Sequence, residues 1–300
     1  MCFRTLGYGF GWVMVVALAA AATTEGVYRS EIQKWRENYE AGLRKENGWL
    51  ALAGLYWLKD GNNDFGTGLG NSIVLPPGTA PQMAGTFIFH SGKTRLLAKS
   101  GVPLSLNGKP VRTELPLSPD TSGHPDRIAL GRLNMIVIQR GSRYGIRLWD
   151  NGSAARREFA GVRWFPIQES FRVTARFTSY PQPRMIPILN VLGDSEENPS
   201  PGYAAFELAG KSCRLEPLLE DGRLFFIIKD LTSGKQTYPA GRFLYTSLPQ
   251  DGKVVLDFNE AINPPCAFTP YATCPLPPKQ NYLPVAVNAG AEKPDTAASH

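Results

Sequence analysis

Apolar and polar positions recur with two different periods along the chain. In residues 27–45 the apolar side chains recur every three or four positions and share one helical face: Ile32, Trp35, Tyr39 and Leu43. Ser30 and Glu31 can cap the start, and Gly48 follows the end. The spacing predicts a lead helix over 24–48 that docks on the main body.

Beyond this helix, short apolar segments alternate with turn sequences. Asn107-Gly108 and Asp221-Gly222 are typical hairpin turns. Strands spaced roughly ten residues apart are typical of sandwiches and barrels. We therefore predict a mainly β fold, in which a β-sandwich-like region (49–152) is followed by a β-rich sandwich or barrel-like region (153–288).

The two ends of the chain differ from its body. Residues 10–22 form an apolar run of 13 residues that ends in alanines, with Arg4 as the one charge before it. A membrane-spanning helix needs about 20 such residues, so we predict a signal peptide over 1–23. An uncleaved anchor and a buried helix are the alternatives. We expect no stable membrane span after signal removal, a periplasmic or extracellular location, and a disordered tail over 289–300.

The charge of the chain does not predict a nucleic-acid partner. The net charge is +6, and no Lys/Arg run concentrates it. The basic residues are unevenly distributed: residues 140–184 contain nine arginines and no lysine. These arginines lie either on a solvated face or on a face that binds anions.

Three cysteines follow the predicted signal peptide. Cys266 and Cys274 lie in a loop, residues 263–278, which contains six prolines and so cannot form a regular helix or central strand. An oxidising compartment would permit a Cys266–Cys274 disulfide and leave Cys213 as a buried thiol. The sequence leaves the two pairings that use Cys213 open.

Several kinds of chemistry have no support in the sequence. No G-x-S-x-G elbow occurs, and the three histidines are His90, His124 and His300. Only His124 lies in a loop suited to catalysis, without identified partners. The cysteines lack nearby histidines at zinc-ligand spacing. We therefore predict neither a metal nor a cofactor.

The best polar cluster lies in the C-terminal third. Asp230 and Asp257 are the candidate catalytic carboxylates. The candidate ligand-binding residues are Thr237, Tyr238, Arg242, Asn259, Asn263 and Tyr271. In one interpretation Arg242 and Asp257 form a buried pair that fastens the cysteine loop. In the other, Arg242 grips an anionic group while Asp257 acts as a base or acceptor in a pocket beside that rigid loop.

Long stretches of the chain resemble a family named domain of unknown function 1684. The stretches are DLTSGKQTYPAGRFLYT, DFNEAINPPCAFTPYATCPLPPKQNYLPV, GWLALAGLYWLKDGNNDFG, GIRLWD and GVRWFP. The resemblance covers most of residues 35–290 and implies no particular mechanism.

A second resemblance concerns residues 65–148. The segments FGTGLGNSIVLP, SLNGKPV and IALGRL are similar to segments of a forkhead-associated β-sandwich. Such domains bind phosphothreonine through an Arg after the first Gly and a downstream Ser. Here Thr67 follows Gly66, and PGTAPQMAG lacks the Ser, so the resemblance implies the fold without that chemistry.

These observations leave three functional hypotheses. The leading one is a binding or envelope-maintenance protein for a small or polymeric ligand, which is anionic if Arg242 holds it. The alternatives are a hydrolase that uses carboxylates and Arg242, and a structural interaction domain. The ligand and the oligomeric state stay unknown.

Overall fold

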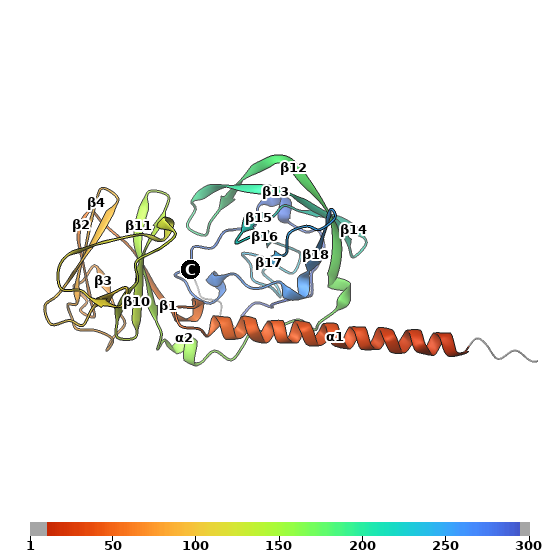
Figure 1. The fold of residues 1–300 in the computed structure, drawn as a ribbon, viewed down its shortest axis with the longest axis horizontal. Helices are drawn as coiled ribbons and strands as arrows, with labels where there is room; N and C mark the ends of the chain where they lie inside the picture. The colour runs from red at the N-terminus through yellow and green to blue at the C-terminus, as the bar shows by residue number, and fades with distance from the viewer. Residues whose placement is uncertain (1–10, 295–300) are drawn as a thin grey trace, which may run out of the picture.

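The computed structural model describes residues 11–294, with side chains from residue 25 onward. Figure 1 shows two β-rich lobes, the first at the left and the second at the right, with α1 running beneath the second. The mainly β fold with an N-terminal helix is confirmed, and no sheet in the described part closes into a barrel.

Helix α1 (Gly11–Leu43) is longer than predicted and begins inside the predicted signal segment. Its buried residues include Tyr28, Ile32 and Leu43. Arg36 fastens it to the second lobe by donating to the carbonyl oxygens of Phe165 and Asn259 at 3.1 and 3.3 Å. Residues 1–10 of the predicted signal peptide lie outside the described residues. Among the described helices, none combines the length and the hydropathy that crossing a bilayer requires.

The first lobe is a sandwich of two sheets. Phe65 and Phe87 of one sheet share a core with Met135 and Leu148 of the other. The six-stranded sheet has the order β1 (Leu52–Trp57), β11 (Arg143–Asp150), β10 (Leu133–Arg140), β9 (Ile128–Leu130), β6 (Ser105–Leu106) and β7 (Lys109–Pro110). The five-stranded sheet has the order β3 (Ile73–Val74), β2 (Gly61–Gly66), β4 (Gly85–His90), β5 (Lys93–Ala98) and β8 (Leu115–Leu117).

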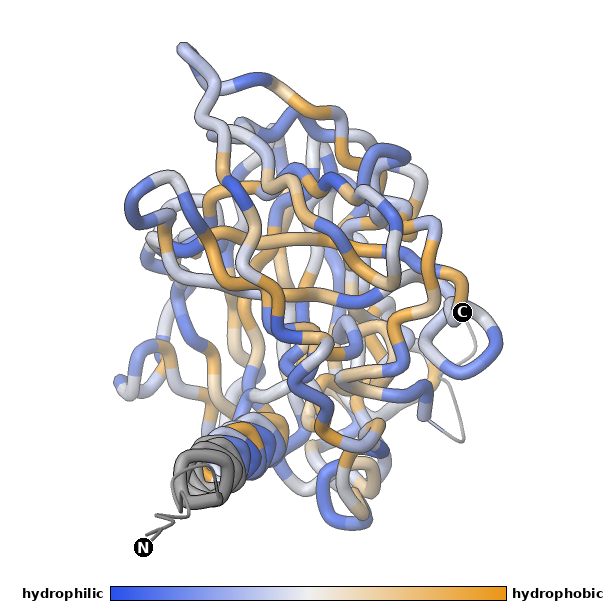
Figure 2. Tube along the Cα trace, turned by 90° about the vertical axis from the view of Figure 1, so that its right-hand side faces the viewer, coloured by the Kyte–Doolittle hydropathy of each residue, from blue (hydrophilic) through white to orange (hydrophobic). Residues whose placement is uncertain are grey.

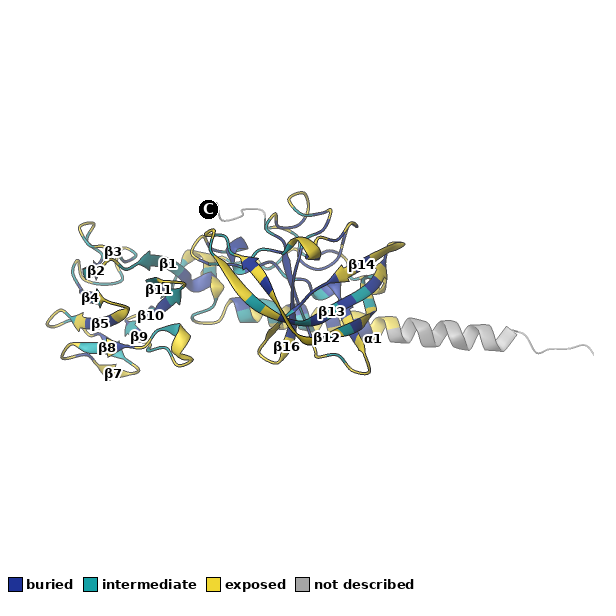
Figure 3. Ribbon diagram, turned by 90° about the horizontal axis from the view of Figure 1, so that it is seen from above, coloured by how far each residue is buried: buried dark blue, intermediate teal, exposed yellow. Residues whose placement is uncertain are grey.

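The second lobe surrounds its own core with two further sheets. One has the order β14 (Lys211–Leu215), β13 (Ser195–Leu208), β12 (Arg172–Leu189) and β18 (Lys253–Asp257). The other has the order β15 (Leu218–Glu220), β16 (Arg223–Ile228) and β17 (Arg242–Thr246). Hydrophobic and hydrophilic positions alternate along many of these strands (Figure 2), as expected when one face of a sheet covers a core. Exposed stretches mark the long β12–β13 hairpin (Figure 3).

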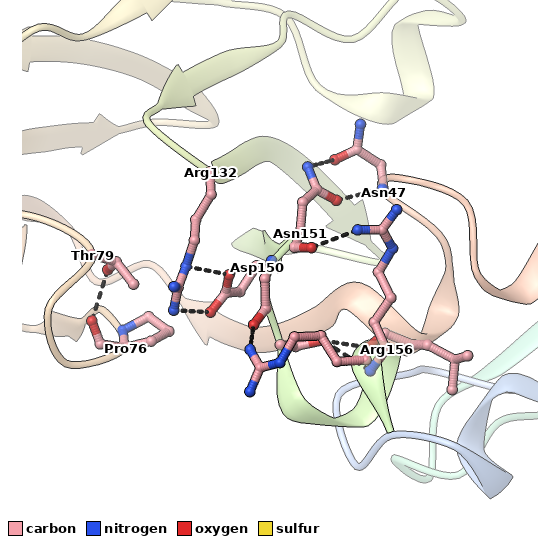
Figure 4. A network of polar contacts seen from close by, with 11 residues as sticks. Asn47, Pro76, Thr79, Arg132, Asp150, Asn151 and Arg156 are labelled. Carbon is pink, nitrogen blue, oxygen red and sulfur yellow. Dashed lines mark hydrogen bonds and ion pairs between the residues drawn. The ribbon is translucent and has the colours of Figure 1, made fainter. Parts of the chain in front are cut away.

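The two lobes are joined by an apolar cluster and a polar network. Leu52 and Trp149 of the first lobe pack with Ile186 and Phe225 of the second. The polar network lies where α1, β11 and α2 (Ala154–Arg157) meet (Figure 4). Its main contacts are Arg132 to Asp150 at 2.8 Å, the Asn47 N–H to Asn151 at 2.8 Å, and Arg156 to the carbonyl oxygens of Arg44 and Asn151.

The end of the described chain packs against the second lobe. Ala289 and Ala291 are fully buried, and Ala291 pairs with Trp164 in an isolated bridge. Gly290 has a φ of +77°, and a Cβ there would lie 2.5 Å from the Ala261 carbonyl oxygen, so only glycine fits. The prediction of disorder over 289–300 is therefore wrong for residues 289–294, and the rest of that tail lies outside the described residues.

Candidate functional site

A cavity of about 330 Å³ lies between the two lobes, and we call it the interlobe cavity. The first lobe contributes β10 and β11, and the second contributes β15, β16, β17 and the cysteine loop. Most of its lining is aromatic or apolar. The lining residues are Tyr39, Trp49, Arg140, Arg147, Glu220, Phe225, Phe243, Tyr245, Ile262, Asn263, Pro265, Phe268, Ala272, Thr273, Cys274 and Pro275.

Arg147 is the charged group that distinguishes this cavity. On β11, Ile146 and Leu148 point into the first core, so Arg147 points out of the opposite face toward the second lobe. The second lobe covers that face, and the exposed fraction of Arg147 is only 9%. Its guanidinium carbon lies 5.8 Å from the centre of the Trp49 ring.

Arg147 has no counter-ion within the part of the chain that the structure describes. No ion pair or hydrogen bond joins its guanidinium to another described residue, and its Nε is buried without a partner. Burial, followed by the nearby Arg140 cation, lowers the pKa of Arg147 to about 10, and the Asp120 carboxylate, which pairs with Arg140, acts in the opposite direction without contacting Arg147. The side chain is therefore still charged at neutral pH.

The other charged, phenol and amide groups of the interlobe cavity have partners of their own, with one exception. Arg140 is paired with Asp120 at 2.7 Å, and the Tyr245 hydroxyl donates to Glu220 at 3.1 Å. Burial raises the pKa of Tyr39, so its hydroxyl stays a neutral donor. The exception is Asn263, which donates from Nδ2 to the Glu292 carbonyl oxygen at 2.7 Å but whose Oδ1 is buried without a partner.

The cysteine loop makes one wall of the interlobe cavity, and it is firmly held. A disulfide joins Cys266 to Cys274, as predicted, with 6.2 Å between their Cα atoms, and Cys213 is a free, buried thiol. The hydroxyl of Tyr238 donates to the Cys266 carbonyl oxygen at 3.0 Å. Thr269 donates to the Leu52 carbonyl oxygen at 3.1 Å, which ties the loop to the first lobe. This wall is therefore pre-organised before any ligand arrives.

A second hollow of about 390 Å³, which we call the side groove, adjoins the interlobe cavity. The two share five lining residues: Arg140, Glu220, Phe225, Thr273 and Pro275. Asn190 and Asn198 of the β12–β13 hairpin also line the groove. The side groove therefore adds polar groups of that hairpin beside the interlobe cavity.

The structure corrects the predicted partner of Arg242. Arg242 pairs with Asp230 at 2.9 Å, not with Asp257, and each side chain is only 1% exposed. Its guanidinium also donates to the carbonyl oxygens of Val287 and Ala289, so it fastens the C-terminal segment rather than the cysteine loop. With its terminal donors taken up by the protein, Arg242 is not placed to grip a ligand.

Asp230 and Thr237 belong to the same buried network. Asp230 accepts from the Thr232 hydroxyl at 2.6 Å and from the Val287 N–H at 3.2 Å. The hydroxyls of Thr232 and Thr237 lie 2.8 Å apart. Asp230 lines none of the cavities described here, so the structure does not bring the two candidate carboxylates together.

Asp257 and Asn259 lie elsewhere, beside a third hollow of about 720 Å³ that we call the carboxylate cavity. Asp257 accepts from the Tyr28 hydroxyl at 2.8 Å and from both nitrogens of Asn259 at 3.0 Å. Glu260 lines the same cavity, where burial and then the Asp257 charge raise its pKa to about 7. Glu260 was not predicted as a site residue, although it is three residues from Asp257.

Of the predicted ligand-binding residues, only Asn263 lines the interlobe cavity. Tyr271 is 38% exposed and lines none of the cavities described here. Tyr39 and Arg147 were not predicted as site residues, although Arg147 is one of the nine arginines of residues 140–184. Across the described residues, no three His, Cys, Asp or Glu side chains gather closely enough to hold a metal ion.

Comparisons with known proteins place the chain in a family. The model of the family described as "Protein of unknown function (DUF1684)" matches residues 157–292. An uncharacterised protein of Haloarcula marismortui, solved by NMR, is 32% identical over 46% of this chain and 79% of its own, with a TM-score of 0.39. The chain belongs to the DUF1684 family. The match falls on the second lobe and ends just before the described chain does, so the motifs quoted from the first lobe lie outside it.

Two forkhead-associated structures are also similar to part of the chain. One is the FHA domain of FhaA in complex with the intracellular domain of another protein, 19% identical over 31% of this chain and 96% of its own, with a TM-score of 0.23. The other comes from a study of phosphothreonine-dependent FHA interactions, with 19% identity, 32% and 92% coverage and a TM-score of 0.23. We draw no functional conclusion from either. A search of the curated proteins found no match.

Proposed function

We propose that this DUF1684 protein is an exported binding protein that holds a small anionic ligand in the interlobe cavity. The observation that carries the proposal is Arg147, a charged side chain that is 9% exposed and has no counter-ion among the described residues. Nε of this cation is buried without a partner, and burial of a charge without a counter-ion costs free energy. An anionic ligand that binds beside Arg147 recovers that cost.

The walls of the interlobe cavity fit the remainder of such a ligand. Trp49, Phe225 and Phe268 offer aromatic surface around the cation. An apolar part of the ligand gains free energy when it leaves water for such a surface. The proposed ligand therefore combines an anionic group with an apolar or aromatic body.

Two features support export. The apolar run of residues 10–22 has the length of a signal peptide core. The Cys266–Cys274 disulfide belongs in an oxidising compartment such as a periplasm. A fusion of residues 1–30 to a reporter that is active only outside the cytoplasm tests this part of the proposal, and a fusion that stays inactive contradicts it.

Native mass spectrometry tests the binding role. The wild-type protein, purified from its export compartment, is expected to carry an added mass that is lost on denaturation. The Arg147→Met variant is expected to lack this mass, because a thioether of similar length cannot pair with an anion. Arg127→Met, which removes an exposed arginine of the first lobe, is the matched control and is expected to keep it. An added mass that survives in Arg147→Met contradicts the assignment of Arg147.

One observation favours an enzyme as the second candidate. Asp257 and Glu260 line the carboxylate cavity together, and a pKa of about 7 suits Glu260 to a general acid. A Glu260→Gln variant that abolishes a hydrolytic activity while keeping the wild-type unfolding midpoint supports this candidate. Full activity in Glu260→Gln contradicts it.

A further inference from the structure

Asn263 is held in one orientation at the wall of the interlobe cavity. Its side chain is 2% exposed, and Nδ2 donates to the Glu292 carbonyl oxygen at 2.7 Å. A flipped amide would bring Oδ1 against that carbonyl oxygen, which is also an acceptor. The hydrogen bond therefore fixes which end of the amide faces away from Glu292.

The segment that supplies this hydrogen bond is itself fastened. The Ala291 N–H donates to the Ala261 carbonyl oxygen at 2.7 Å, and the Glu292 N–H donates to the Arg163 carbonyl oxygen at 2.9 Å. The Glu292 carboxylate also pairs with Arg163 at 2.9 Å. Asn263 thus cannot turn to pair its Oδ1 without breaking a rigid contact.

The free Oδ1 is an acceptor, whereas Arg147 is a donor. Within the described part of the chain, Oδ1 of Asn263 and Nε of Arg147 are buried without hydrogen-bond partners, and both residues line the interlobe cavity. Buried polar groups in folded proteins are almost always hydrogen-bonded. An ionised carboxylate or sulfate only accepts hydrogen bonds, so it can satisfy Arg147 but not Asn263.

We propose that the ligand carries an O–H or N–H donor close to its anionic group, and that Asn263 selects for this donor. The proposal rests on the proposed function, because it assumes that the anionic group lies beside Arg147. A cavity of about 330 Å³ is at the small end of the usual range for ligand sites. The ligand class is therefore a small hydroxy acid or amino acid with an apolar or aromatic side group.

Three probes that differ in one substituent test the proposal by titration calorimetry with the full-length protein. The probe 3-phenylpropanoate has a carboxylate and a ring but no further donor, phenyllactate adds a hydroxyl, and phenylalanine adds an ammonium group. We expect the wild-type protein to bind at least one of the two donor-bearing probes about tenfold or more tightly than 3-phenylpropanoate. The better of the two identifies the donor as a hydroxyl or an ammonium group.

The variant Asn263→Leu removes the acceptor at nearly the same size. We expect the donor-bearing probe and 3-phenylpropanoate to bind it with affinities equal within about twofold. Asn71→Leu, in the first lobe, is the matched control: it also loses hydrogen bonds to backbone carbonyls, and it is expected to keep the wild-type preference. The preference of the wild-type protein for a donor-bearing probe is measured without any variant. The test therefore remains decisive even if Asn263→Leu fails to fold.

The outcomes separate the two proposals. If 3-phenylpropanoate binds in an Arg147-dependent manner and as tightly as both other probes, the role of Asn263 is wrong and the proposed function stands. A donor preference that persists in a folded Asn263→Leu variant also overturns the role of Asn263. If none of the three probes binds, or if binding is unchanged in Arg147→Met, the proposed function fails and the inference fails with it.

Discussion

Two buried arginines of this molecule have opposite surroundings. Arg242, in the second lobe, pairs with the Asp230 carboxylate and donates to backbone carbonyl oxygens of residues 287–291. Nε is buried without a partner in both residues, but the terminal nitrogens of Arg147, at the interlobe cavity, make no hydrogen bond or ion pair with a described residue. The contrast shows that burial of a charge alone does not indicate a ligand site. The presence or absence of partners distinguishes a structural cation from one that awaits a ligand.

We expect the largest effect on stability from replacing Arg242, the structural cation of the two. Arg242→Met leaves the buried Asp230 carboxylate without its cation, so we expect the free energy of unfolding to fall by about 3–5 kcal/mol in urea denaturation. The double variant Arg242→Met/Asp230→Leu removes both charges and is expected to recover part of that loss. A fall of less than about 1 kcal/mol in the single variant would show that the pair is not structural.

The disulfide comes next, because it holds the wall of the interlobe cavity. Replacing Cys266 and Cys274 by serine is expected to lower the free energy of unfolding by about 2.5 kcal/mol, because the unfolded chain gains the entropy of an open loop. The variant should also bind the anionic probes more weakly, since the wall is then ordered only on binding. Cys213→Ala is the control with the disulfide intact. Equal stability of wild type and double variant in urea would contradict the expected role of the loop.

Glu260 extends the comparison to a half-buried carboxyl group. Its pKa is raised from 4.5 to about 7, so between these pH values the folded state binds more protons than the unfolded state. The free energy of unfolding therefore falls as pH rises from about 4.5 to about 7. Over this pH range, we expect the free energy of unfolding of Glu260→Gln to fall by about 1 kcal/mol less than that of the wild type. This value is reduced for solvent screening, because Glu260 is partly exposed.

The matched control for this pH dependence is Glu158→Gln, at an exposed position. Urea midpoints measured at a series of pH values between 4 and 8 give the comparison. If the urea midpoints of wild type and Glu260→Gln change in parallel with pH, burial does not raise the pKa of the Glu260 carboxyl group.

Local sequence patterns predicted much of the fold. The three-to-four spacing gave the face of the lead helix that carries Ile32 and Leu43, and turn residues marked the short strands. The proline-rich loop also followed from composition, and the Cys266–Cys274 disulfide was the favoured candidate among the three pairings that the sequence left open. These features depend on neighbours in sequence, so one chain without relatives is enough to find them.

Features that depend on packing between distant segments were missed or misread. Arg242 was paired with Asp257, although the β16–β17 hairpin, which pairs Ile228 with Arg242, brings Asp230 next to it. The segment from Ala289 was read as disordered because its residues are small, whereas close packing under Ala261 is what requires them to be small. Arg147 lies on a strand face that is buried only because the second lobe covers it, and no local pattern in β11 shows this.

The free energy of unfolding of Arg147→Met shows whether Arg147 is a ligand site or a structural cation. If Arg147 is a ligand site rather than a structural cation, its removal relieves an unpaired buried charge. Urea denaturation should then show a stability equal to that of the ligand-free wild-type protein or higher by about 1 kcal/mol. A loss of about 3 kcal/mol or more, as expected for Arg242→Met, would mean that Arg147 has a structural partner and would contradict the account.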